Sequence, residues 1–335
     1  MSDGSDEPPP RQPRDIQSLL RLCMETVPQD PSSTSQELHP LDPERRQWLS
    51  DALHSMTTDV VQEMVKSVDS IKNGLNERTD DGLISMDTIE KMEESIDSLI
   101  DVTGNLDNAR DFYKIGGFDI FRPLLESNSE ILKMKACELL AEVVQNEIEC
   151  QSHALDTNLL DLLVRLLDED PHESVRIKSL YAISCLIRDN ESAQQLFESK
   201  LDGLSVLLKA IDSTNPLSKD NKLRIKASFL MSSLCRKQSI CDSLYGLGVL
   251  TQLIGALQGE HDSTHEHLLA ALYTLVSAHE PSKQDCRRRE WGLKNFLKQR
   301  IEELKGSEEF LEELDYCNRL LELLFIDKDL PESER

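Results

Sequence analysis

The sequence is poor in aromatic residues, in basic charge and in long apolar runs. Aromatic residues make up 4% of its 335 residues and β-branched alternation is absent, so a β-sheet fold is not predicted. Lys and Arg number 37 against 62 Asp and Glu, and the formal net charge of −25 repels phosphate backbones and anionic lipid. No apolar stretch approaches the ~20 residues of a membrane span. We therefore expect no nucleic-acid and no membrane binding.

Signals for export and for disulfides are also missing. The N-terminus, MSDGSDEPPPRQPRD, lacks a basic start followed by an apolar run, so we predict no signal peptide and a cytoplasmic protein, with the nucleus as a second compartment. No C-x-x-C pair occurs, which favours small buried thiols over metal ligands or disulfides. The eight cysteines are Cys23, Cys137, Cys150, Cys185, Cys235, Cys241, Cys286 and Cys317.

Catalytic and cofactor motifs are absent as well. Gly246 and Gly248 form a G-x-G without the third glycine of a dinucleotide fingerprint, and no phosphate-binding loop, nucleophile elbow or H-E-x-x-H occurs. His261, His265 and His267 are the best metal candidates, but a loop that runs into a helix N-terminus, where polar residues are expected, is the favoured explanation, so we predict no metal site. We expect a protein that is not an enzyme and needs no cofactor.

What is present begins with a proline-rich arm. Eight of the thirteen prolines fall before residue 44, so residues 1–41 are predicted to be largely disordered. One amphipathic segment, DIQSLLRLCMET, interrupts the arm; it is either a docking peptide or a stray helix. From Pro43 apolar residues recur at helical spacing, with Asp42 as the expected N-cap. We assign residues 42–84 to N-terminal capping helices, which break at NGLNERTDDG and resume near Met86.

Two phrases then repeat through the chain. LKMKACELLAEVV at 132, VRIKSLYAISCLI at 175 and LRIKASFLMSSLC at 223 lie 43 and 48 residues apart, and HEHLLAALYTLV at 265 is a fainter copy. A second phrase has its turn residue at Gly117, Asn158, Gly203 and Gly248. This period is typical of armadillo or HEAT repeats, so we predict an all-α solenoid over residues 85–282. Residues 283–335 are predicted to form two C-terminal capping helices. Arg287, Arg288 and Arg289 are expected to begin a cap helix as a solvated face, with a localisation signal or an anion contact as the alternatives.

In such solenoids function usually lies along a concave groove lined by the last helix of each repeat. Each groove residue that the repeat register selects could contact a partner or serve packing. These residues are Lys135, Glu138, Glu142, Arg176, Lys178, Tyr181, Cys185, Arg224, Lys226, Phe229, Ser233 and Glu266.

The amino-acid sequence of several stretches resembles that of a known family, the armadillo-type nucleotide exchange factors of heat shock protein 70, which are related to the Fes and Sil factors. The stretches are ERRQWLSDAL, NLDNARDF, VRIKSLYAISCLIRDNE, LDGLSVLLKA and HEHLLAALYTLV. The resemblance runs from about Asp15 to about Glu280. It implies a monomeric co-chaperone whose groove holds the ATPase domain of heat shock protein 70 and promotes release of ADP and of the client.

The resemblance also implies a role for the arm, which in this family is similar to a substrate mimic for the chaperone's peptide-binding domain. The residues concerned here are Leu19, Leu20, Leu22 and Met24. A passive armadillo adaptor is the alternative function. An import-receptor type of adaptor is disfavoured, because Trp48 and Trp291, the two tryptophans, lie outside the repeats.

Overall fold

The computed structural model describes residues 43–77, 84–212, 214 and 221–326, and residues 43–59 only as helical backbone. The chain divides into two units, residues 1–67 and 68–335. The described part of the first unit consists of α2 (Pro43–Asn76), which continues into the second unit. The sequence analysis predicted more than one helix over residues 42–84, and the structure has a single helix in the described part of that range. The predicted N-cap Asp42 lies outside the described residues.

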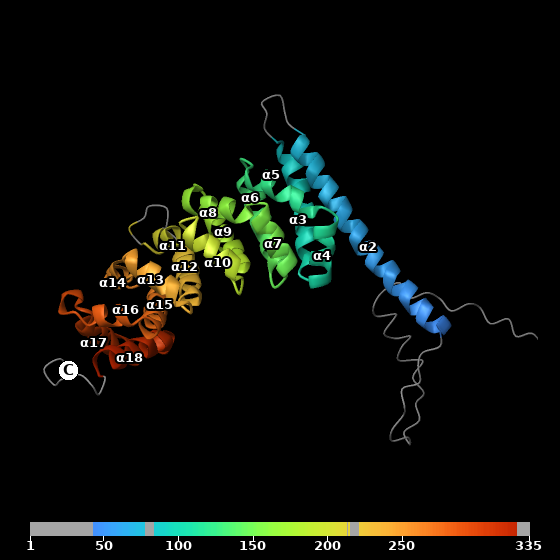
Figure 1. Cartoon of the computed structure of the whole chain (residues 1–335). Coiled ribbons are helices and arrows are strands. Elements are labelled where there is room, and N and C mark those ends of the chain that lie inside the picture. Colours follow the sequence, from blue (N-terminus) through green and yellow to red (C-terminus); the bar gives the residue numbers. More distant parts are fainter. Residues whose placement is uncertain (1–42, 78–83, 213, 215–220, 327–335) are drawn as a thin grey trace, which may run out of the picture. The chain divides into compact units, whose positions relative to one another are not determined.

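The second unit is built from helices that recur in sets of three. The following element, α3, spans Met86–Thr103, begins near the predicted residue, and is capped by the Ser85 side chain, which accepts from the Thr88 backbone N–H. The sets that follow are α4 (Leu106–Lys114), η1 (Gly117–Ile120) with α5 (Phe121–Leu125) and α6 (Glu130–Val144); α7 (Ile148–Asp156), α8 (Leu159–Glu169) and α9 (Glu173–Ile187); α10 (Glu191–Ser199), α11 (Gly203–Ile211) and α12 (Asn221–Leu234); and α13 (Gln238–Gly246), α14 (Val249–Leu257) and α15 (His265–Ala278). Each set lies beside its neighbours in chain order (Figure 1).

The C-terminal part contains two longer helices, at the place of the predicted capping helices, together with one short α-helix and two 3-10 helices. These elements are α16 (Glu280–Cys286), η2 (Arg289–Trp291), α17 (Leu293–Leu304), η3 (Glu308–Phe310) and α18 (Leu311–Phe325). The third helix of each set packs on the third helix of the next, α6 on α9, α9 on α12 and α12 on α15. The series is extended at its two ends by α3, which packs on α6, and by α18, which packs on α15. α18 thus takes the place of a third helix in a last, atypical repeat, as the end of a solenoid requires. The all-α armadillo-like solenoid is confirmed.

The core runs along these third helices. Their inward positions are apolar and fully covered, as at Leu140, Ile183, Met231 and Leu272. The seven cysteines that the structure describes are buried, as predicted, and burial raises the pKa of Cys137 to about 12. Among the described residues, no single helix is long and apolar enough to cross a membrane; the bent pair α13–α14 reaches that length and composition only jointly.

The turn that starts each second helix needs a residue in the left-handed region. Gly116 (φ 76°), Asn158 (φ 55°), Asp202 (φ 51°) and Gly248 (φ 80°) fill this place. The predicted turn residues Asn158 and Gly248 are confirmed. In the other two copies the left-handed residue lies one position before the predicted glycine. Asp and Asn are, after glycine, the residues that tolerate this conformation best, so an aspartate can replace the expected glycine.

Gly117 and Gly203, the residues predicted for those two turns, have a different reason to be glycine. A Cβ atom on Gly203 would lie 2.4 Å from the Phe197 ring, and one on Gly117 would lie 2.5 Å from the Phe112 ring. Both phenyl groups belong to the first helix of the same repeat and are buried. These glycines allow close packing of the first helix against the second.

Buried arginines join the second and third helices of a repeat. Arg176 Nη1 donates to the Asp170 carbonyl oxygen at 2.6 Å, and Arg224 Nε donates to the Ile211 carbonyl oxygen at 3.4 Å. The two arginines occupy the same position of the repeat and are 3% and 5% exposed. Each one satisfies a carbonyl at the end of a helix, where no intrahelical N–H is available.

Ion pairs near the start of the third helices join one repeat to the next. Lys133 of the first set lies 2.5 Å from the Asp170 carboxylate of the second, and Arg224 of the third lies 2.9 Å from Asp262 of the fourth. Asp262 also accepts a hydrogen bond from the hydroxyl of Thr264 at 2.5 Å. We call the positions of Lys133, Asp170, Arg176, Arg224 and Asp262 the repeat seams.

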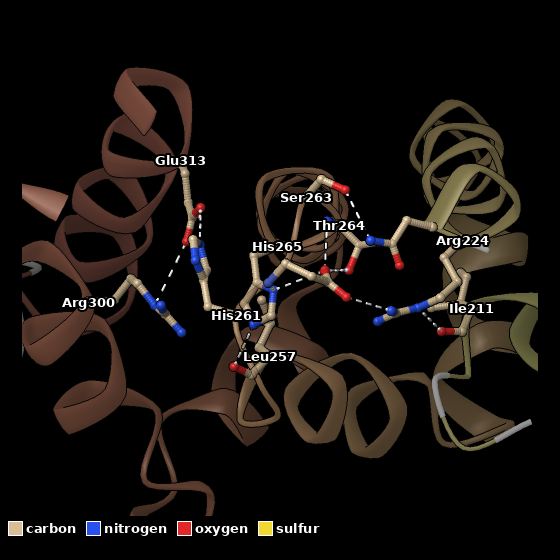
Figure 2. Close-up of polar contacts among 11 residues, drawn as sticks. Ile211, Arg224, Leu257, His261, Ser263, Thr264, His265, Arg300 and Glu313 are labelled. Carbon is tan, nitrogen blue, oxygen red and sulfur yellow. Dashed lines mark hydrogen bonds and ion pairs between the residues drawn. The ribbon is translucent and has the colours of Figure 1, made fainter. Parts of the chain in front are cut away.

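The seam changes its charge pattern at the C-terminal end. His265 takes the position of Arg176 and Arg224, and its Nε2 lies 3.1 Å from the Leu257 carbonyl oxygen. One repeat further, the corresponding residue is a buried carboxylate, Glu313 of α18, which pairs with His261 at 2.9 Å (Figure 2). At this position of the repeat, the third helix therefore carries an arginine in the middle repeats and a carboxylate at the C-terminal end of the solenoid.

Candidate partner-binding groove

The outward sides of α9 and α12 form a surface pocket of about 680 Å³. Four of the predicted groove residues line it: Tyr181 from α9, and Lys226, Phe229 and Ser233 from α12. They come together because α9 and α12 occupy equivalent places in consecutive repeats and pack side by side. These four residues thus lie at one surface pocket, and their contact with a partner stays a prediction.

Tyr181 is held at the pocket by both of its neighbours. Its hydroxyl donates to Glu142 Oε1 of α6 at 3.2 Å, and Lys226 Nζ lies 5.9 Å from the centre of its ring. Burial and the nearby Cys185 and Glu142 raise the pKa of the phenol, which therefore stays a neutral hydroxyl donor. The tyrosine links three successive third helices.

Phe229 stands out from the pocket with 65% of its surface exposed. Its only described ring partner is His267 of α15, at 5.7 Å between ring centres. Burial lowers the pKa of His267, so the imidazole is neutral near pH 7. An exposed phenylalanine beside a neutral ring gives the groove an apolar centre.

The N-terminal side of the same surface is occupied by ion pairs. Lys178 Nζ lies 2.8 Å from Glu138 Oε1, and Lys135 Nζ lies 2.5 Å from Asp97 of α3. All of these side chains are partly exposed, and each pair joins one third helix to the next. Lys135, Glu138, Glu142 and Lys178 thus lie along the predicted face but outside the pocket.

Three predicted groove residues are placed elsewhere by the structure. Arg176 and Arg224 are buried in the repeat seams, and Cys185 is 5% exposed with its thiol covered. Arg176 and Arg224 precede Lys178 and Lys226 by two residues, and two residues turn a helix by about 200°. The prediction that these three side chains face a partner is therefore wrong.

The predicted Glu266 lies in the first turn of α15, away from the pocket. It is half-buried, and burial together with the neighbouring carboxylate Glu312 of α18 raises its pKa. The two carboxyl groups form an acidic end of the third-helix face. The predicted arm residues Leu19, Leu20, Leu22 and Met24 lie outside the described residues.

Sequence reasoning missed three basic residues of the pocket: Arg188, Lys222 and Arg236. Arg188 and Arg236 occupy the same repeat position, thirteen residues after Val175 and Leu223, so extending the aligned phrase by one residue would have found both. Lys222 precedes the third copy by one residue and has no such signal.

The histidines and arginines that the sequence analysis left open have structural contacts. His261 and His265 bind seam partners, and among the described residues no three His, Cys, Asp or Glu side chains converge on a metal position. Arg287 Nε donates to the Leu324 carbonyl oxygen of α18 at 2.9 Å. The three arginines do not begin a cap helix as predicted: they follow α16 and lead into η2.

The fold defines a helical-repeat protein of the armadillo type. A designed armadillo repeat protein superposes with a TM-score of 0.58 at 20% identity, covering 78% of this chain and 99% of that one. The family model "SIL1/FES1/HPBP1 C-terminal domain" matches residues 108–245, and "Nucleotide exchange factor Fes1" matches residues 16–112. The chain belongs to the SIL1/FES1/HPBP1 family.

Named relatives span most of the chain. Hsp70-binding protein 1 of Mus musculus is 32% identical over 325 residues, covering 94% of this chain and 87% of the relative. The protein of the same name from Homo sapiens is 32% identical over 324 residues, with 94% and 86% covered. The Hsp70 nucleotide exchange factor FES1 of Saccharomyces cerevisiae is 28% identical over 189 residues, with 52% and 61% covered.

Proposed function

We propose that this chain is a co-chaperone that binds the ATPase domain of heat shock protein 70 through the α9–α12 groove and accelerates ADP release. The observation that carries the proposal is the groove itself, in which Tyr181, Lys226 and Phe229 meet on exposed surface. Its relatives are named for heat shock protein 70 binding and nucleotide exchange, which supports the choice of partner.

The mechanism needs no chemical step from this chain. A partner that binds the open nucleotide cleft better than the closed one shifts the chaperone toward the open state by that difference in affinity. A hundredfold preference corresponds to about 2.7 kcal/mol and changes the open-to-closed ratio by the same factor. ADP then leaves, ATP enters, and the client is released. The protein acts as a cytosolic monomer in this scheme.

A stopped-flow measurement of ADP release tests the proposal. Heat shock protein 70 loaded with a fluorescent ADP is mixed with excess ATP, with and without this protein at micromolar concentration. We expect a large acceleration of release. Binding without acceleration would contradict the exchange function and leave a passive armadillo adaptor.

Deletion of residues 1–40 tests the arm separately. If the arm occupies the chaperone's peptide groove after client release, the shortened protein should still accelerate ADP release but release a fluorescent client peptide more slowly. Peptide release is followed by anisotropy in the same mixtures. Equal peptide release by both proteins would show that the arm is not a client mimic.

A further inference from the structure

The α9–α12 pocket has the opposite charge to the rest of the chain. The whole protein carries a formal charge of −25. Of the described residues that line the pocket, four are basic, Arg188, Lys222, Lys226 and Arg236, and one is acidic, Asp189. All five are exposed. A local excess of cations in so acidic a protein is not accounted for by the average composition.

Two neighbouring carboxylates on the α6 side contact other side chains. Glu142 accepts the Tyr181 hydroxyl, and Glu138 is paired with Lys178. On the α15 side the pocket ends at His267, which is neutral near pH 7. The acidic pair of Glu266 and Glu312 lies beyond the residues that line the pocket.

The basic side chains surround an apolar centre. Phe229 is largely exposed, and Ile225 and Leu230 also line the pocket. Exposed aromatic residues within a rim of charge are typical of the residues that dominate binding energy at protein interfaces. Charge at the rim chiefly sets the rate of encounter and the choice of partner.

We propose that this pocket receives an acidic segment of the partner, with one apolar side chain packed on Phe229 and carboxylates held by Lys222, Lys226, Arg188 and Arg236. The inference rests on the proposed function, because it takes the groove as the surface that holds heat shock protein 70. It adds the chemistry of the docked surface: carboxylates around an apolar side chain.

Zero-length crosslinking with a carbodiimide reads this chemistry directly, because the reagent joins an amine only to a carboxylate in contact with it. The full-length protein and heat shock protein 70 are crosslinked, and the linked peptides are identified by mass spectrometry. We expect Lys222 and Lys226 to couple to Asp or Glu residues of the chaperone. Coupling at Lys298 of α17, an exposed lysine outside the pocket, with none at Lys222 or Lys226, would overturn the proposal.

The same reaction without the chaperone tests other occupants. Coupling of Lys222 or Lys226 to acidic residues of residues 1–42 or 327–335 of the same chain, or of a second copy, would overturn the assignment to a partner. Absence of these links, together with links to the chaperone, supports it.

Charge reversal gives an independent readout. Lys226→Glu and Arg236→Glu should each weaken binding about tenfold at low salt, whereas Lys298→Glu, with the same change in net charge, should change it less than twofold. Raising NaCl from 50 to 300 mM should weaken the unmodified protein more than Lys226→Glu. Equal affinities of all three variants would overturn the proposal.

The two proposals fail in different ways. If the unmodified protein does not bind heat shock protein 70, the proposed function fails. If it binds and accelerates ADP release, but the lysine links and the charge-reversal losses are missing, only the acidic-segment inference fails.

Discussion

The repeat seams and the groove use the same two helices for opposite purposes. Arg224 and Lys226 are two residues apart on α12, yet Arg224 is 5% exposed and bound to Asp262, whereas Lys226 is exposed over the Tyr181 ring. The pair on α9, Arg176 and Lys178, is divided in the same way. Basic residues on one side of these helices are therefore buried in the repeat seams, and those on the other side lie on the exposed face.

The comparison predicts its largest effect for a seam arginine. Arg224→Met should lower the free energy of unfolding by about 3 kcal/mol, because it leaves the partly buried Asp262 and the Ile211 carbonyl without their partner. The measurement is urea unfolding followed by circular dichroism. Lys226→Met is the matched control, and its stability should change by less than about 0.5 kcal/mol. Equal losses in both variants would remove the distinction between seam and groove.

The next largest effect is expected at the close approach within the third repeat. Gly203→Ala should destabilise the protein by roughly 1–3 kcal/mol, because the new methyl group would overlap the buried Phe197 ring. Thermal unfolding followed by circular dichroism gives the shift.

Gly255→Ala is the control for that substitution. Gly255 lies within α14 with no atom near the position of a new Cβ, so alanine should stabilise the helix by up to about 1 kcal/mol. A loss of stability in both variants would argue against the steric explanation.

The smallest effect concerns acid sensitivity at the seam. Partial burial alone would raise the pKa of the Asp262 carboxyl, but hydrogen bonds from Thr264 and the charge of Arg224 outweigh it and lower the pKa to about 2. The lowered pKa stabilises the fold above about pH 4, and this contribution, about 1–2 kcal/mol, is lost as the pH falls from about 4 toward 2.

Asp262→Asn isolates this contribution from those of the other carboxylates. The variant should be less stable than the unmodified protein at pH 7, and the difference should shrink below pH 4. The measurement is the urea midpoint of both proteins between pH 2.5 and 7. A difference that stays constant over this range would exclude a titrating seam aspartate.

The repeat architecture could be predicted from the sequence because each copy carries the same apolar spacing. The sequence could bring Tyr181, Phe229 and Ser233 together because equivalent positions of stacked repeats share a face, and the three residues line one pocket. Arg176 and Arg224 were misplaced because arginine counts as polar in any pattern, although its long stem can be buried when the guanidinium finds carbonyl and carboxylate partners. The contact between Gly203 and Phe197 depends on how two helices pack, which a repeat alignment does not contain.

The most direct test of the groove is the rate of ADP release from heat shock protein 70 with a pair of exposed apolar variants. Phe229→Ala changes the groove, and Ile148→Ala changes an equally apolar side chain, 74% exposed, at the start of α7 and outside the pocket. We predict that Phe229→Ala lowers the acceleration at subsaturating concentration about tenfold and that Ile148→Ala leaves it unchanged. Equal rates for the two variants, with equal helicity, would contradict a partner-binding groove between α9 and α12.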